Sequence, residues 1–228
     1  MELGRETRDL DFLVRKLKNE SETLQKVFNE IATIDLQDHF SFSDVEIDPL
    51  THFHMLYPGT QVSLKGNFGN TRFKITIDLG FGDLVDPIER EIELTHLNND
   101  VFPDLKIELS CYPPEFIFAE KLETVVSRGG SNSRMKDFFD LFLMTKETGL
   151  LEANKTKQVI ETVFSHREIP LELPINFNEE ETNTLQEYWK PFLSKLHPTL
   201  IDEKSLPVNI EDLIKVINEF LKETIFLN

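Results

Sequence analysis

The sequence has few cysteines and no long apolar run, which disulfide-rich secreted proteins and membrane proteins respectively require. It contains one cysteine, Cys111, so no disulfide can form within the chain, as is typical of a reducing compartment. We expect this thiol to be buried and structural. No apolar run approaches the ~20 residues of a membrane span, and charged residues stand where a signal peptide would have its apolar segment. We therefore expect a soluble, cytoplasmic protein without a membrane partner.

Basic residues are also scarce. Lys and Arg together number 24 against 41 Asp and Glu, and the formal net charge is −17. A field of this sign repels nucleic acid and anionic lipid unless a local basic patch or a bound metal reverses it. Any nucleic-acid substrate must therefore be held locally.

The chain contains enough apolar residues to form a folded core. Its 228 residues suffice for one large domain or two ordinary ones, and the 39% hydrophobic content includes 19 Phe, which we expect to do much of the packing. Strand patterns dominate as far as Tyr112, helical patterns follow, and two prolines mark the change. We predict an α+β protein, with a small mixed-sheet domain over 1–112 followed by a helical-bundle domain over 113–228.

Hydrophobic periodicity places the individual elements. Alternation predicts strands over 40–47, with a slip near Asp44, and over 61–64, 72–81, 87–94 and 104–109, with a hairpin tip at 66–70. A period of 3.6 residues predicts helices over 19–33, 116–128, 134–144, 155–164, 179–196 and 211–221. Trp189 is expected in the core, and nothing in the last third resembles a catalytic motif.

Two aspartates stand near the amino terminus, in the segment Arg8-Asp9-Leu10-Asp11-Phe12-Leu13. On an extended segment Asp9 and Asp11 point to the same face, because successive side chains alternate. Their carboxylates could then hold Mg²⁺, which binds carboxylate oxygens and keeps places for water and substrate phosphates. The other interpretation of this pair, in so acidic a chain, is a solvated turn or helix start.

A third carboxylate lies on the clearest predicted strand. Over 72–81 alternate residues are apolar, and Asp78 lies on the opposite side, with Lys74 and Thr76. An ordinary solvent-facing residue would fit this position. Asp78 could also complete a metal site begun by Asp9 and Asp11, because a two-metal site needs a further ligand to position nucleophile and leaving oxygen.

The helical half supplies two more acids. Asp137 and Asp140 stand at i and i+3 in a strongly apolar helix, so they share roughly one side of it. Acids among Phe and Leu are costly unless a cation pairs with them. Lys121, Arg128, Arg134 or a bound metal could supply that charge, and a structural salt bridge is the alternative to a catalytic role.

Lys121 and a glycine-rich connection precede that helix. Lys121 is displaced from the apolar face of 116–128, so it is either an exposed lysine or one that reaches into a cleft. The glycines within 128–133 predict a flexible helix–helix connection, since their spacing matches neither a P-loop nor a dinucleotide fingerprint.

Taken together, these blocks resemble the AbiEii/AbiGii-type nucleotidyltransferase toxins of the DNA polymerase β-like nucleotidyltransferase superfamily. The resemblance covers about residues 5–145, and the later chain fits the family's helical domain by position. It is carried by Arg8-Asp9-Leu10-Asp11, Ile77-Asp78-Leu79-Gly80-Phe81-Gly82-Asp83, Ala119-Glu120-Lys121-Leu122 and Ser133-Arg134-Met135-Lys136-Asp137-Phe138-Phe139-Asp140-Leu141.

The resemblance implies a role for each matched residue. Asp9 and Asp11 would be the metal-binding pair that positions a nucleoside triphosphate through Mg²⁺, and Asp78 would help to deprotonate the attacking hydroxyl. Lys121 would stabilise the negative charge that shifts onto pyrophosphate. Asp137 would be the last motif's acid, with Asp140 as the second candidate. Arg8 and Arg128 are further candidates for contact with the nucleotide.

The resemblance also implies a function. It points to magnesium-dependent transfer of a nucleotidyl group to an RNA 3′ end, with tRNA as the expected acceptor. The protein would be a bacterial toxin restrained by a cognate antitoxin in abortive infection, a form of phage defence. Because the acidic charge disfavours RNA, a protein or small-molecule acceptor stays open.

One family feature is missing from the sequence. Family members have a Gly-Gly-Thr or Gly-Ser segment upstream of the aspartate pair, whereas Gly4 is too close to Asp9 to serve. We expect either that the amino terminus is longer or that part of the nucleotide site has been lost. The alternative function is therefore a catalytically impaired module that binds a nucleotide or a protein.

Overall fold

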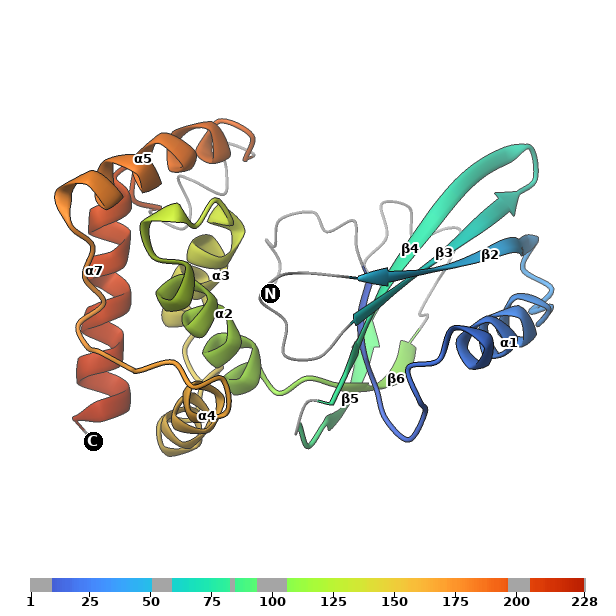
Figure 1. Cartoon of the computed structure of the whole chain (residues 1–228), viewed down its shortest axis with the longest axis horizontal. Coiled ribbons are helices and arrows are strands. Elements are labelled where there is room, and N and C mark those ends of the chain that lie inside the picture. Colours follow the sequence, from blue (N-terminus) through green and yellow to red (C-terminus); the bar gives the residue numbers. More distant parts are fainter. Residues whose placement is uncertain (1–9, 51–58, 83–84, 94–105, 197–205, 228) are drawn as a thin grey trace. The chain divides into compact units, whose positions relative to one another are not determined.

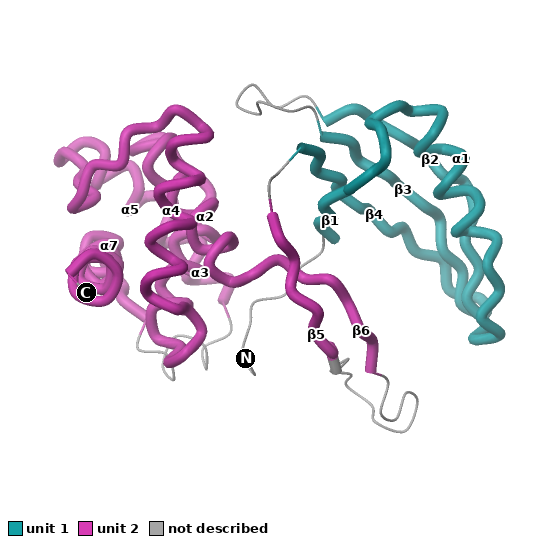
Figure 2. The backbone as a smooth tube through the Cα atoms, turned by 90° about the horizontal axis from the view of Figure 1, so that it is seen from below, with its two compact units in different colours: residues 1–84 teal, residues 85–228 magenta. Residues whose placement is uncertain are grey.

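The computed structural model describes residues 10–50, 59–82, 85–93, 106–196 and 206–227. The chain divides into two compact units, Met1–Leu84 and Val85–Asn228, drawn teal and magenta in Figure 2. Each unit has its own hydrophobic core.

The first unit is a four-stranded mixed sheet with one helix (Figure 1). The strand order is β1-β4-β3-β2. β1 (Leu10–Val14) runs parallel to β4 (Thr71–Phe81), whereas β3 (Gly59–Phe68) is antiparallel to both β4 and β2 (Phe40–Leu50). The connection from β1 to β2 contains α1 (Ser21–Ala32). The described residues of β1, Leu10–Val14, pair with the carboxyl-terminal half of β4, Ile77–Phe81.

Helix α1 covers one face of this sheet. Its buried Leu24 packs with Val62, Leu64 and Leu79 from the two central strands, and Phe28 adds to the same cluster. The strand alternation puts these residues on one face, so the polar residues between them must lie on the other. The sheet therefore has an apolar face towards α1 and a polar face opposite.

Aromatic packing explains a glycine in the middle of β3. The ring of Phe73 lies directly over Gly66, where a Cβ atom would be only 2.3 Å from the ring. Phe40 stacks on Phe68 with ring centroids 4.5 Å apart and meets Phe73 edge-on. The end of the sheet near the β3–β4 turn is thus closed by rings on its apolar face.

The second unit begins with a two-stranded hairpin and continues as helices. β5 (Ile88–Glu93) pairs antiparallel with β6 (Lys106–Cys111). The helices in the described residues of this unit are α2 (Pro114–Arg128), the 3₁₀ turn η1 (Gly129–Ser131), α3 (Met135–Lys146), α4 (Ala153–His166), α5 (Glu179–Leu193), α7 (Ile210–Phe220) and the π-helical turn η2 (Leu221–Phe226). Four phenylalanines and the tryptophan are fully buried in its core: Phe118, Phe138, Phe139, Phe142 and Trp189.

The predicted α+β class, a mixed sheet followed by helices, is confirmed, and so are the buried Trp189 and the packing role of Phe. The predicted boundary at 112–113 coincides with the change from strands to helices, but the compact units divide earlier, because the β5–β6 hairpin groups with the helices. The expectation for Cys111 was wrong, because this free thiol is only half-buried at the end of its strand. No helix in the described part of the chain combines the length and apolar character of a membrane span.

Two local features of the first unit differ in extent from the predictions. The slip near Asp44 is present as a register shift between Ser43 and Glu46, with Asp44 at φ +50°. The hairpin tip is shorter than the predicted 66–70. β3 and β4 stay paired up to Phe68 and Thr71, which leaves a two-residue turn of Gly69 and Asn70.

The segment 128–133 connects two helices, as predicted, but it contains a packed helical turn in place of the expected flexible loop. Gly129 to Ser131 form η1, and Gly130 is buried against α5. A Cβ atom at Gly130 would lie 2.4 Å from both Cβ and Cγ of Glu181. Glu181 itself belongs to the capping box of α5, exchanging hydrogen bonds with Asn178. Gly130 therefore allows η1 to pack closely against α5, and the spacing of the glycines in the sequence does not reveal this contact.

Candidate nucleotidyl-transfer residues

The polar face of the sheet has a row of side chains that crosses all four strands. Asp11 of β1 lies directly opposite Asp78 of β4. On the other side of Asp78 lies Gln61 of β3, and beyond Gln61 lies Asp48 of β2. Residues directly opposite one another on adjacent strands point to the same face, with the strands about 4.8 Å apart. The structure thus brings Asp11 and Asp78 together, as the metal-site hypothesis requires.

Gln61 is a member of this row that the sequence analysis missed. Its Nε2 donates a hydrogen bond of 2.8 Å to Oδ1 of Asp78. This bond holds the carboxylate in one orientation and leaves its other oxygen for another partner. The signal was present in the sequence, because counting back from a two-residue turn at Gly69 and Asn70 places Gln61 opposite Asp78.

The donor set fits a divalent cation. Like charges directly across neighbouring strands repel, so Asp11 and Asp78 would gain from a cation between them. Carboxylate oxygen is also the ligand that Mg²⁺ prefers. Arg8 and Asp9, the other candidates from this segment, lie outside the described residues. Among the residues described, no group of three or more His, Cys, Asp or Glu is placed to hold a metal.

The second unit has a compact ion-pair cluster around Lys121. Its Nζ lies 3.0 Å from Oδ1 of Asp137 and 2.8 Å from Oδ2 of Asp140. The Nε of Arg134 lies 2.8 Å from the other oxygen of Asp137. The side chain of Asp137 is 2% exposed and those of Lys121 and Asp140 are 20% exposed. The two acids of α3 are therefore paired with cations, and Lys121 is not the exposed lysine of the alternative interpretation.

Arg128 takes no part in this cluster. It is exposed at the end of α2 and forms no ion pair with any residue that the structure describes. Of the cations proposed from the sequence, Lys121 and Arg134 provide the charge that Asp137 needs.

Asn132, also missed by the sequence analysis, fixes the approach to α3. It is fully buried; its Nδ2 donates to the carbonyl of Thr124 on α2, and its Oδ1 accepts from the backbone N–H of Arg134. The end of α2 and the start of α3 are thereby tied together. Since Lys121 is on one helix and Asp137 on the other, this tie helps to set their separation.

The charge state of Asp137 follows from its neighbours. Burial raises the pKa of this carboxyl, but the charges of Lys121 and Arg134, with their hydrogen bonds, outweigh burial and hold the pKa below its ordinary value. Asp137 is thus an anion with two cationic partners. Its geometry suits positioning of Lys121 and Arg134 better than a proton-transfer role.

We expect Asp137→Asn to destabilise the protein at neutral pH by about 2–3 kcal/mol, because two cations lose their buried partner. A folded-state pKa below the unfolded value means that this stabilisation is fully present above pH ~4 and is lost as pH falls through the folded-state pKa. Urea unfolding at neutral pH and near pH 3 measures the difference between variant and parent. A penalty of equal size at both pH values would contradict this account.

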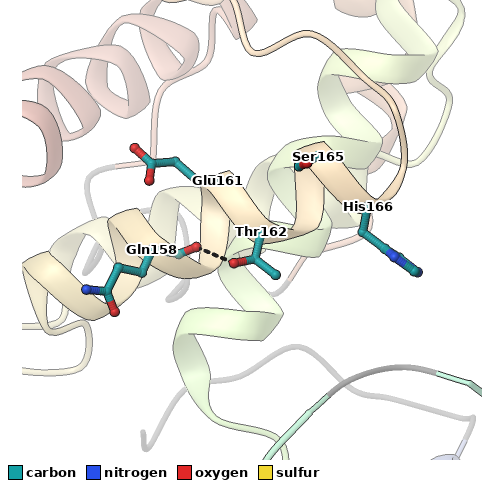
Figure 3. Close-up of a pocket in the computed structure, with 5 residues that line it drawn as sticks. All are labelled: Gln158, Glu161, Thr162, Ser165 and His166. Carbon is teal, nitrogen blue, oxygen red and sulfur yellow. Dashed lines mark hydrogen bonds between the residues drawn. The ribbon is translucent and has the colours of Figure 1, made fainter.

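A shallow hollow on the outer face of α4 offers no comparable arrangement. It is lined by five exposed residues of this helix: Gln158, Glu161, Thr162, Ser165 and His166. Figure 3 shows these side chains spread along the helix rather than converging, with the hydroxyl of Thr162 donating to the carbonyl of Gln158. This is ordinary helix surface.

Comparison with known proteins gives the family. JHP933 from Helicobacter pylori is 15% identical over 97% of this chain and 76% of its own, with a TM-score of 0.40. A candidate nucleotidyltransferase from H. pylori is 18% identical over 96% and 76%, with a TM-score of 0.37. None of the curated proteins compared with the chain matches it. The family model of the nucleotidyl transferase AbiEii toxin, type IV toxin–antitoxin system, matches residues 2–216, and the chain therefore belongs to this family.

Proposed function

We propose that this protein is a magnesium-dependent nucleotidyltransferase toxin that transfers a nucleotidyl group from a nucleoside triphosphate to the 3′ end of an RNA, with tRNA as the acceptor. The observation that supports this best is the direct pairing of Asp11 with Asp78 on neighbouring parallel strands. Membership of the AbiEii family supplies the reaction class and an antitoxin as the cognate partner. Action in the bacterial cytoplasm and a role in phage defence complete the proposal.

The reaction would be an in-line displacement at the α-phosphorus. A bond forms between the acceptor hydroxyl oxygen and this phosphorus, and the bond to the bridging oxygen of pyrophosphate breaks. Asp78, held by Gln61 through one oxygen, would take the hydroxyl proton on the other. Mg²⁺ held by Asp9, Asp11 and Asp78 would orient the triphosphate and neutralise part of its charge.

Lys121 would stabilise the charge that develops on the leaving pyrophosphate. A buried carboxylate at Asp137 and a second at Asp140 keep its ammonium in place. Asp137 also pairs with Arg134, so the cluster has two cations and two carboxylates, and a triphosphate would compete with the carboxylates for the ammonium of Lys121.

The direct test is transfer of label from each α-labelled nucleoside triphosphate to total bacterial tRNA in the presence of Mg²⁺. Labelled RNA that depends on Mg²⁺ would establish the activity and identify the nucleotide. Absence of label with all four nucleotides would contradict the proposal and favour a nucleotide- or protein-binding module without catalysis.

A further inference from the structure

The polar face of the sheet changes its charge along the strands. At one end lie the acids of the row described above. Towards the β3–β4 turn the directly opposed pairs are instead Lys65 with Lys74, and Asn67 with Arg72. From the acidic row to this turn, β3 and β4 present only polar side chains to this face. In a chain of net charge −17, β3 and β4 thus have a local group of three cations here, although Asp44 and Glu46 of the neighbouring β2 act on Lys65.

Two of these three cations are available to a ligand. Lys65 pairs with Asp44 at the bulge of β2, with Nζ and Oδ2 2.9 Å apart. Arg72 and Lys74 are exposed, and neither forms an ion pair with a residue that the structure describes. Along an extended strand, Lys74 lies roughly 13 Å and Arg72 roughly 20 Å from Asp78, at about 3.3 Å per residue.

We propose that this basic end of the sheet, formed by Lys65, Arg72 and Lys74, binds the phosphodiester backbone of a single-stranded nucleic acid and directs its end towards Asp11 and Asp78. The proposal rests on the proposed function, since it names where the acceptor of that reaction is held. The three cations would then attract the phosphates of the last nucleotides of the acceptor, although the net charge of the whole chain repels nucleic acid.

The chemistry of the patch favours a nucleic-acid strand over a protein. Arg and Lys contact phosphate oxygens, and small hydroxyl and amide side chains add hydrogen bonds to phosphate and sugar. Ser41 and Ser43 on β2 stand directly across from Asn67 and Lys65, and Thr76 lies on the same face. A protein interface would need apolar anchors, which this face of β3 and β4 lacks.

A competing role for the cations is protection of an exposed strand edge. Among the residues that the structure describes, no strand lies on the outer side of β4 from Thr71 to Thr76. Charged residues on such edges prevent pairing with other chains. Edge protection requires charge of either sign, whereas phosphate binding requires positive charge. Reversal of the charge therefore separates the two roles.

The test is binding of a fluorescent single-stranded oligoribonucleotide, measured by anisotropy over a range of salt concentrations, without nucleotide substrate. The variant is Arg72→Glu with Lys74→Glu, and the control is Lys26→Glu with Lys222→Glu, which changes the net charge equally at exposed positions elsewhere. We expect the first pair to weaken binding at least ~10-fold and to reduce the salt dependence by about 0.7 per lost contact, and the control to keep both near the parent values.

Three outcomes would overturn the proposal. They are absence of oligoribonucleotide binding by the parent, equal loss in test and control variants, and an unchanged salt dependence in the test variant. Unfolding temperatures of all variants show whether the fold persists. Because binding is measured without transfer, its failure is distinguishable from failure of the nucleotidyl-transfer proposal, which the labelling experiment addresses.

Discussion

Replacing Asp11 with Asn is expected to abolish nucleotidyl transfer while leaving the protein as stable as the parent or slightly more so. Asp11 is exposed and directly opposite Asp78, so its removal relieves repulsion between two carboxylates. The same change takes away a ligand from the proposed metal site, which is worth several kcal/mol of transition-state stabilisation. We expect a loss of about 10³-fold or more in the rate of label transfer to RNA.

Asp48→Asn is the matched control. Asp48 is exposed and belongs to the same row across the sheet, but two strand spacings separate it from Asp78. The control should keep parental activity and stability. Full activity in Asp11→Asn, or equal losses in the two variants, would show that the metal site has been assigned to the wrong carboxylate.

Replacing Lys121 with Met is expected to lower both activity and stability. The thioether side chain keeps much of the length of lysine but leaves Asp140 without this cation and Asp137 with Arg134 alone. Because Lys121 and Asp140 are partly exposed, we expect a cost of about 2 kcal/mol, below that of a fully buried pair. Loss of the charge opposite pyrophosphate should reduce transfer a further ~10²–10³-fold beyond any unfolding.

The variant Lys121→Arg separates the effect of Lys121 on stability from its effect on the rate of transfer. Its positive charge keeps a partner for both acids, so stability should return, while the different shape of the guanidinium should leave transfer impaired. Chemical unfolding and single-turnover transfer on the same preparations give the two quantities. If Lys121→Met lost stability alone and transferred label at the parental rate, Lys121 would be purely structural.

The sequence predicted the elements well where periodicity was strong. The alternation along β4 and the 3.6-residue period in α1 and α7 reflect one buried face each, which is the physical origin of such patterns. The predicted strand at 61–64 was shorter than β3, because Gly66 and Asn67 suggested a turn. The ring of Phe73 over Gly66 overrides that local preference, and no local pattern shows such a contact.

The residues of the candidate site could be named from the sequence more readily than the contacts that they make. Asp11, Asp78, Lys121 and Asp137 were all identified from the sequence. Lys121 and Arg134 were also among the cations named for Asp137, whereas the hydrogen bond from Gln61 to Asp78 was not predicted, because it depends on strand register. Gln61 could have been found by counting back from a two-residue turn at 69–70, whereas Asn132 emerges only with the structure.

The contact between Gly130 and Glu181 links the last third of the chain, which has no catalytic motif, to the spacing of the groups around Lys121. η1 joins α2 to α3, and its place is set by the first turn of α5. A side chain at Gly130 could be accommodated only if that turn moved, together with the capping hydrogen bonds between Asn178 and Glu181. In evolutionary terms, these two segments should change together: a family member without this glycine should also have a different start to the helix that corresponds to α5.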